Sequence, residues 1–132
     1  MEKIEHIGIA VIDLEAANQL FAKLFGKKHY KVETVESEGV RTSFFDVKPN
    51  KIELLEATNS QSPIAKFIEK KGEGVHHIAF AVNDIGAEIK RLKSEGFIVL
   101  NEKPKKGADN KLVAFLHPKS TNSVLVELCQ EI

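Results

Sequence analysis

The sequence predicts an α+β domain in which two tandem βαβββ modules form one curved mixed, mostly antiparallel sheet around a metal-containing cleft. An internal repeat is the first indication: residues 4–25 and 75–96 align at a constant offset of 71 positions, with six identical residues. Each half also ends in an apolar strand pattern with one embedded acid, KIELLE and then VLVELC. At 132 residues we expect a single domain, with module 1 at about 1–58, a connecting helix at about 62–72 and module 2 at about 74–132.

The first strand pattern alternates, as a half-buried strand does. His6, Gly8 and Ala10 share one face, and the bulky residues between them share the other. The bulky face should pack on a helix that Asp13 caps and Gly26 ends. Three further strands are then expected, at His29–Glu36, Val40–Val47 and Lys51–Glu56.

The second module repeats this pattern. His77, Ala79 and Ala81 share a face, Asp84 is the expected N-cap, and Gly96 ends the helix. Its later strands are expected at Phe97–Lys103, Lys111–His117 and Val124–Cys129.

The segment SPIAKFIEKKGEG between the modules has the signals of a short helix. Ser62 is placed as the N-cap, Pro63 as the first helical residue and Gly72 as the stop. This helix is expected to bury Ile64, Phe67 and Ile68.

Composition narrows the range of partners and compartments. Lys+Arg and Asp+Glu are both 19, so no basic excess indicates nucleic acid or an anionic membrane surface. No segment approaches 18 uninterrupted apolar residues, so no membrane span is predicted. Cys129 is the single cysteine, which rules out an intrachain disulfide and fits a reducing compartment. We interpret the chain as cytoplasmic.

The repeat places a histidine early and a glutamate late in each half. His6 and Glu53 belong to the first half, and His77 and Glu127 belong to the second. A lone carboxylate in an apolar strand is usually an edge residue facing water, and a lone histidine is usually a hydrogen-bonded core residue. Recurrence of all four favours one divalent metal ion per chain instead, because an acid inside an apolar strand is costly unless it is paired or metal-bound. Mixed nitrogen and oxygen ligands suit Co, Ni, Zn or Mn.

Several segments together resemble a known family. HIGIAV, HHIAFAV, KIELLE, SPIAKF, FLHPKS and VLVEL are similar to the methylmalonyl-CoA epimerase family of the vicinal oxygen chelate (glyoxalase/bleomycin-resistance/dioxygenase) superfamily, over nearly the whole chain. The resemblance implies the metal ligands His6, Glu53, His77 and Glu127, an acyl-CoA substrate and a homodimer. It also implies interconversion of (R)- and (S)-methylmalonyl-CoA, by removal and return of the α-proton through a metal-stabilised enolate.

The reaction needs two proton-transfer groups, one on each face of the substrate carbon, and the arguments for the two groups differ. Glu127 is the expected first group. Some relatives carry a separate glutamate on the strand before the first acid, where this chain has Thr42, which cannot act as a base. We therefore expect Glu53 to serve the opposite face of the substrate.

The phosphates of coenzyme A need cationic partners, and the second half offers several lysines. Candidates for substrate binding are Lys105, Lys106, Lys119 and Ser120, with Lys103 and Lys111 in the same loop. Solvated surface lysines and a simple turn serine are the plain alternatives.

Two other functions stay open. A glyoxalase-type lactoylglutathione lyase uses the same kinds of ligand, although Arg41 and Arg91 are the only arginines available for a glutathione site. A non-catalytic small-molecule binding protein on the same fold is the second alternative, and the intact ligand set in both halves argues against it.

Overall fold

The structure, a computed structural model, describes residues 1–132. The chain divides into two compact units. We call His6–His76 the N-terminal unit, and Met1–Glu5 together with His77–Ile132 the C-terminal unit. The division falls inside two strands, because both β1 (Lys3–Ala10) and β5 (Gly74–Ala81) run from one unit into the other.

The N-terminal unit has strand order β2-β3-β4-β1. β1 pairs with β4 in parallel, whereas β4 with β3 and β3 with β2 are antiparallel. The predicted mixed, mostly antiparallel pairing is therefore confirmed in this unit. Its elements after β1 are α1 (Leu14–Phe25), β2 (Lys31–Val35), the 3₁₀ turn η1 (Glu36–Glu38), β3 (Val40–Val47), β4 (Asn50–Ala57) and α2 (Pro63–Lys71).

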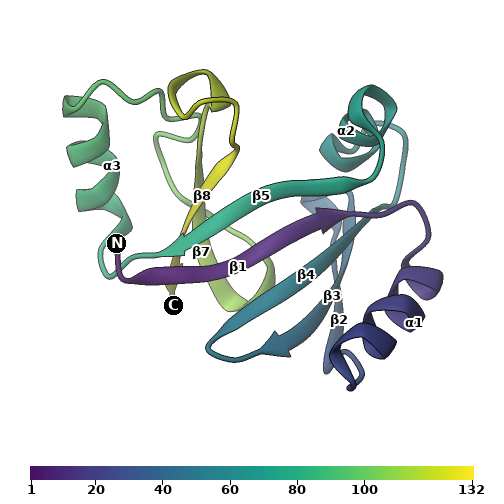
Figure 1. Ribbon diagram of the computed structural model, residues 1–132. Coiled ribbons are helices and arrows are strands. Elements are labelled where there is room, and N and C mark those ends of the chain that lie inside the picture. The colour runs from purple at the N-terminus through teal and green to yellow at the C-terminus, as the bar shows by residue number, and fades with distance from the viewer. The chain divides into compact units, whose positions relative to one another are not determined.

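Helices α1 and α2 lie on opposite sides of these strands (Figure 1). Buried Leu14 of α1 packs with Phe45 and Leu54 on one face. Ile64 of α2 packs with residues of the other face, among them Ala10 and Leu55. Alternation along β4 separates the two sets, so the sheet of this unit is covered in part on both sides.

The predicted ends of these helices are confirmed. Asp13 accepts a hydrogen bond from the N–H of Ala16, and Gly26 adopts the left-handed conformation, with φ of 74°, that ends α1. The Ser62 hydroxyl accepts from the N–H of Ile64 at the start of α2. The chain then enters β5, where His76 packs edge-on against Phe67 of α2, with ring centroids 5.0 Å apart.

The C-terminal unit repeats the arrangement with strand order β5-β8-β7-β6. Here β5 and β8 are parallel, and the other two pairs are antiparallel. The first residues of the chain complete this unit, since the N–H of Glu2 donates to the carbonyl of Ala81 over 2.8 Å. Its remaining elements are α3 (Ile85–Ser94), β6 (Lys105–Lys106), η2 (Ala108–Asn110), β7 (Lys111–Leu116), η3 (Pro118–Ser120) and β8 (Val126–Glu131).

Helix α3 covers one face of the second set of strands. Asp84 caps it by accepting from the N–H of Ala87, as predicted. The hydrophobic core between this helix and the strands includes Ile85 and Ile89 of α3, Leu116 of β7 and Leu128 of β8. The α+β class and the paired βαβββ modules are thus confirmed. None of the helices combines the length and the apolar run that crossing a membrane requires.

The strand predicted at Phe97–Lys103 is wrong. This segment runs beside β7 with one isolated bridge, Val99 to Leu116, and the strand β6 begins only at Lys105. The ladder is interrupted because the side-chain oxygen of Asn101, rather than a backbone carbonyl, accepts from the N–H of Phe115. Pro104 then removes a backbone donor just before β6.

Candidate active site

The N-terminal unit brings His6 and Glu53 together. In the parallel pairing of β1 with β4, Gly8 lies opposite Glu53, so the glutamate and His6 share a face. His6 Nδ1 and Glu53 Oε2 are 3.1 Å apart. Both residues are buried, with 4% and 6% of their surface exposed. A histidine and a carboxylate from distant parts of the module therefore form a close pair out of contact with bulk water.

The C-terminal unit contains the matching pair. Ala79 lies opposite Glu127 in the parallel pairing of β5 with β8. His77 Nε2 and Glu127 Oε1 are 3.0 Å apart, and both residues are buried. The repeat therefore builds one buried imidazole–carboxylate pair in each unit.

The surroundings of the two pairs also correspond. Small residues, Gly8 and Ala79, lie beside the glutamates on one neighbouring strand. On the other neighbouring strand an aromatic residue lies opposite each glutamate, Phe44 in the first case and Phe115 in the second. The His77 ring meets Phe115 edge-on at 6.0 Å between centroids. Apolar walls of this kind exclude water and strengthen electrostatic interactions at the pairs.

The donor set has a clear chemical preference. Each unit supplies one imidazole nitrogen and one carboxylate oxygen, and burying a carboxylate is costly without a cation or a hydrogen-bonding partner. Nitrogen and oxygen donors of this type fit a first-row divalent metal such as Co, Ni, Zn or Mn. The residues present therefore suit the metal that the sequence predicts.

Comparison with known proteins shows the family to which the chain belongs. Residues 5–115 match the model of the Glyoxalase/Bleomycin resistance protein/Dioxygenase superfamily. An ethylmalonyl-CoA/methylmalonyl-CoA epimerase from Cereibacter sphaeroides is 43% identical, covering 97% of this chain and 97% of its own. The chain belongs to this superfamily. Within it the chain is a member of the methylmalonyl-CoA epimerase family, and it is therefore an enzyme.

Solved structures of that family superpose closely. A variant of Streptomyces coelicolor methylmalonyl-CoA epimerase in complex with 2-nitronate-propionyl-CoA gives a TM-score of 0.93 at 35% identity, covering 99% of this chain and 95% of that one. The epimerase from Mycobacterium tuberculosis gives 0.93 at 32% identity, covering 98% and 88%. The fold of this chain is therefore the fold of the epimerase family.

Thr42, for which the sequence predicts no role as a base, lies on the same face as Glu53. It is opposite Leu55 on β4 and opposite Glu33 on β2. Only 1% of its surface is exposed. A threonine hydroxyl is neutral at physiological pH and offers a hydrogen bond rather than a negative charge.

The residues expected to bind substrate are dispersed. Lys105 lies opposite Val113 and therefore shares a face with Glu127, whereas Lys106 lies opposite Leu112 on the other face. Lys119 is exposed on η3.

Two other candidates are engaged within the protein. The Ser120 hydroxyl donates to the carbonyl of His117 and accepts from the N–H of Ile98, so it stabilises the turn. Lys111 is buried, with Asp109 and Glu131 at 3.8 and 3.7 Å from its ammonium group.

Sequence reasoning missed a cavity in the C-terminal unit. It has a volume of about 300 Å³ and lies where the start of β1 meets the ends of β5 and β8. Lys111, Glu5 and Cys129 are among its lining residues. The Cys129 thiol is directed at the carbonyl of Phe80, 3.6 Å away, in keeping with a buried, structural cysteine.

Sequence reasoning also missed two hydrogen bonds at the starts of α1 and α3. The carboxylate of Glu56 accepts from the N–H of Leu14, and the side-chain oxygen of Gln130 accepts from the N–H of Ile85. The available signal was the spacing, because both residues stand three positions after a predicted ligand, Glu53 or Glu127.

Proposed function

We propose that this enzyme interconverts the (R) and (S) forms of methylmalonyl-CoA, using one divalent metal ion held by His6, Glu53, His77 and Glu127. The observation that carries the proposal is the duplicated, buried His–Glu pair, at 3.1 Å in one unit and 3.0 Å in the other. Membership of the epimerase family supports the substrate class. A bound divalent cation supplies electrophilic stabilisation for the oxygen of the thioester enolate.

Two carboxylates are enough to move the proton. In the proposed reaction one glutamate takes the α-proton from carbon, and the electron pair of the broken C–H bond delocalises onto the thioester oxygen. The opposite glutamate then delivers a proton to the other face of the same carbon, and the configuration is inverted. We assign these roles to Glu127 and Glu53, because each lies on the pair-bearing face of its own unit.

Burial of the pairs supports this chemistry. Glu53 and Glu127 are each 6% exposed, so little water contacts either carboxylate. The phenyl rings opposite them, Phe44 and Phe115, keep the surroundings apolar. An apolar, water-excluded site strengthens the interaction of fixed charges with a developing enolate.

The decisive experiment follows exchange and inversion together. The protein, loaded with Co²⁺, is incubated with (S)-methylmalonyl-CoA in deuterated water, and both α-deuterium incorporation and formation of the (R) epimer are measured. We expect both, and we expect both to disappear after the metal is removed with a chelator and to return when it is restored. Exchange without inversion would contradict the two-carboxylate assignment. The absence of both exchange and inversion would contradict the proposed function.

Variants assign the roles. Glu127→Gln and Glu53→Gln should each lower epimerisation by about 100-fold or more, because each replaces a charged ligand oxygen by a neutral one and removes a proton carrier. Full activity in Glu53→Gln with loss in Glu127→Gln would refute the role of Glu53. Ethylmalonyl-CoA, named for the Cereibacter relative, measures acyl selectivity, and the glutathione–methylglyoxal hemithioacetal tests the lyase alternative.

The other expectations from the sequence remain predictions. We propose Lys105, Lys106 and Lys119 as contacts for coenzyme A, with Lys105 best placed because it shares the face of Glu127. A homodimer and a cytoplasmic location are likewise proposals, and sedimentation of the metal-loaded protein tests the first.

A further inference from the structure

The two halves share a feature that helix capping alone does not explain. Glu56 Oε2 accepts from the N–H of Leu14 over 2.8 Å, and Gln130 Oε1 accepts from the N–H of Ile85 over 2.7 Å. Leu14 and Ile85 are the first residues of α1 and α3, and both are buried. The same contact is therefore made twice, by a carboxylate in one half and by an amide in the other.

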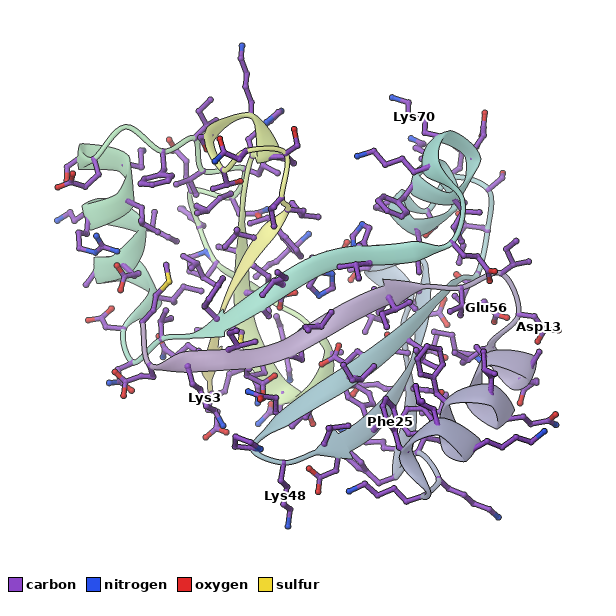
Figure 2. The ribbon with its side chains drawn as sticks, viewed as in Figure 1. Lys3, Asp13, Phe25, Lys48, Glu56 and Lys70 are labelled. Carbon is purple, nitrogen blue, oxygen red and sulfur yellow. The ribbon has the colours of Figure 1, made fainter.

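Each helix already has a cap from its own chain segment. Asp13 accepts from the N–H of Ala16, and Asp84 accepts from the N–H of Ala87. Figure 2 labels Asp13 and Glu56, which both lie at the N-terminal end of α1. The second acceptor differs from the first because it comes from a neighbouring strand, β4, and so connects the helix to that strand.

The connected strands are the ones that carry the proposed ligands. Glu56 stands three positions after Glu53 on β4, and alternation places the two side chains on opposite faces. The helix that Glu56 holds follows directly after β1, the strand that carries His6. One residue before Glu56, the carbonyl of Leu55 accepts a backbone hydrogen bond from the N–H of Val11 over 2.9 Å.

The second half repeats each part. Gln130 stands three positions after Glu127 on β8, and the helix it holds follows β5, the strand that carries His77. The N–H of Val82 donates to the carbonyl of Cys129 over 2.9 Å, in the position matching the first half. In both units the strand with the histidine and the strand with the glutamate are joined just beyond the pair, on the helix side of the sheet.

We propose that Glu56 and Gln130 are positioning residues for the metal site: they fix the strand of each glutamate against the strand of its histidine, so that the pair is preorganised to bind a cation. This rests on the proposed function, because the cation is the one assigned to the His–Glu pairs. A hydrogen-bond acceptor is what the position requires, since the neutral amide of Gln130 makes the same contact as the charged Glu56. Side chains that hydrogen-bond a metal ligand directly contribute about 10–100-fold to metal affinity, so a support that acts one step further from the ligand should contribute up to about 10-fold.

The test compares two ways of weakening the same helix start. Glu56→Ala and Gln130→Ala remove the contact from the strand, whereas Asp13→Ala and Asp84→Ala remove the cap within the helix segment. Chelator-treated protein of each variant is titrated with CoCl₂ by calorimetry at 20 °C, and thermal unfolding of the metal-free protein is recorded in parallel. All four are expected to lose a similar amount of stability, since each loses one hydrogen-bond acceptor at a helix N-terminus.

Only the strand variants, Glu56→Ala and Gln130→Ala, should lose metal affinity. We expect the Kd for Co²⁺ to rise about 5–10-fold in Glu56→Ala and Gln130→Ala and by less than about 2-fold in Asp13→Ala and Asp84→Ala. Glu56→Gln should retain the wild-type Kd, because glutamine makes the contact naturally at Gln130. Equal losses of metal affinity in all four variants would show that Glu56 and Gln130 have a merely structural role. Unchanged Kd values for Co²⁺ in Glu56→Ala and Gln130→Ala would overturn the proposal.

The outcome for wild-type protein separates this inference from the proposed function. Stoichiometric Co²⁺ binding without epimerisation would refute the function and leave the positioning role measurable. Normal epimerisation with unchanged affinity in the strand variants would refute the positioning role alone, and wild-type protein that binds no metal would overturn both. Glu56→Ala also removes the ion pair of Glu56 with Arg41, so if it fails to fold, Gln130→Ala decides the question.

Discussion

Replacing Glu53 by glutamine should separate metal binding from folding. Glu53 and His6 are both more than nine-tenths buried and lie 3.1 Å apart. Glutamine keeps the shape of the side chain and still accepts a hydrogen bond from the imidazole, but it removes a buried negative charge. Because the desolvation cost of that charge disappears along with its attraction for a cation, we expect the metal-free variant to match wild-type stability within about 1–2 kcal/mol.

The metal-loaded proteins should then differ strongly. A cation at 100 times its Kd stabilises the native state by about 2.7 kcal/mol. For a domain of this size each kcal/mol corresponds to roughly 3–5 °C in Tm, so saturation of wild-type protein should raise its Tm by about 8–13 °C. The neutral amide oxygen of glutamine is a weaker metal ligand than a carboxylate, so the same metal concentration should raise the Tm of the Glu53→Gln variant by much less.

Differential scanning fluorimetry with and without Co²⁺ measures both quantities. Glu127→Gln should behave like Glu53→Gln, because the second unit contains the equivalent pair. Glu36→Gln, on the exposed turn η1, is the matched control and should show the full metal-dependent rise. A Glu53→Gln variant whose Tm still rises by about 10 °C with metal would show that binding does not need the negative charge of Glu53, and this prediction would be wrong.

Three further predictions concern stability. Ser43→Ala should stabilise the protein by about 1 kcal/mol in urea unfolding, because the Ser43 hydroxyl is fully buried without a hydrogen-bond partner. Ala114 occupies the matching position in the second half. A loss of stability in the variant would mean that the hydroxyl does have a partner. Leu54→Ala removes a fully buried side chain beneath α1 and should cost about 2–5 kcal/mol in the same assay, so a cost under 1 kcal/mol would contradict tight packing there. The hydrogen bond from Arg91 holds the pKa of Glu88 below its ordinary value of 4.5, so this carboxylate stabilises the fold above that pH and stops doing so as the pH falls through its folded pKa. Glu88→Gln should therefore lose about 0.3–0.5 kcal/mol at pH 7 and nothing at a pH below both pKa values, and an equal loss at both would count against the ion pair.

Much of the fold could be read from the repeat. Asp13 and Asp84 stand at the same place in each copy, and both are helix caps in the structure. The failed strand at Phe97–Lys103 shows the limit of this reasoning, because its apolar residues have strand propensity while the Asn101 side chain displaces the regular ladder. Side-chain competition of that kind depends on the neighbouring strand and leaves no trace in local periodicity.

The residues of the two His–Glu pairs could be predicted from the sequence, whereas the contacts of Glu56 and Gln130 with the helices could not. Alternation gives the face of Glu53 within its own strand, and the duplicate at Glu127 makes an accidental match improbable. The register that sets Gly8 opposite Glu53 is a tertiary property, however, and the sequence contains no direct signal for it. The contact of Glu56 with α1 depends on that register, which is why only its spacing from Glu53 was visible beforehand.

The crossing of β1 and β5 from one unit to the other means that neither half of the sequence contains a whole unit. Residues 1–5 pair within the unit formed by the second half, and residues 74–76 belong with the first. Cutting the polypeptide between the repeats would therefore leave two fragments, each missing a piece of strand that only the other fragment carries.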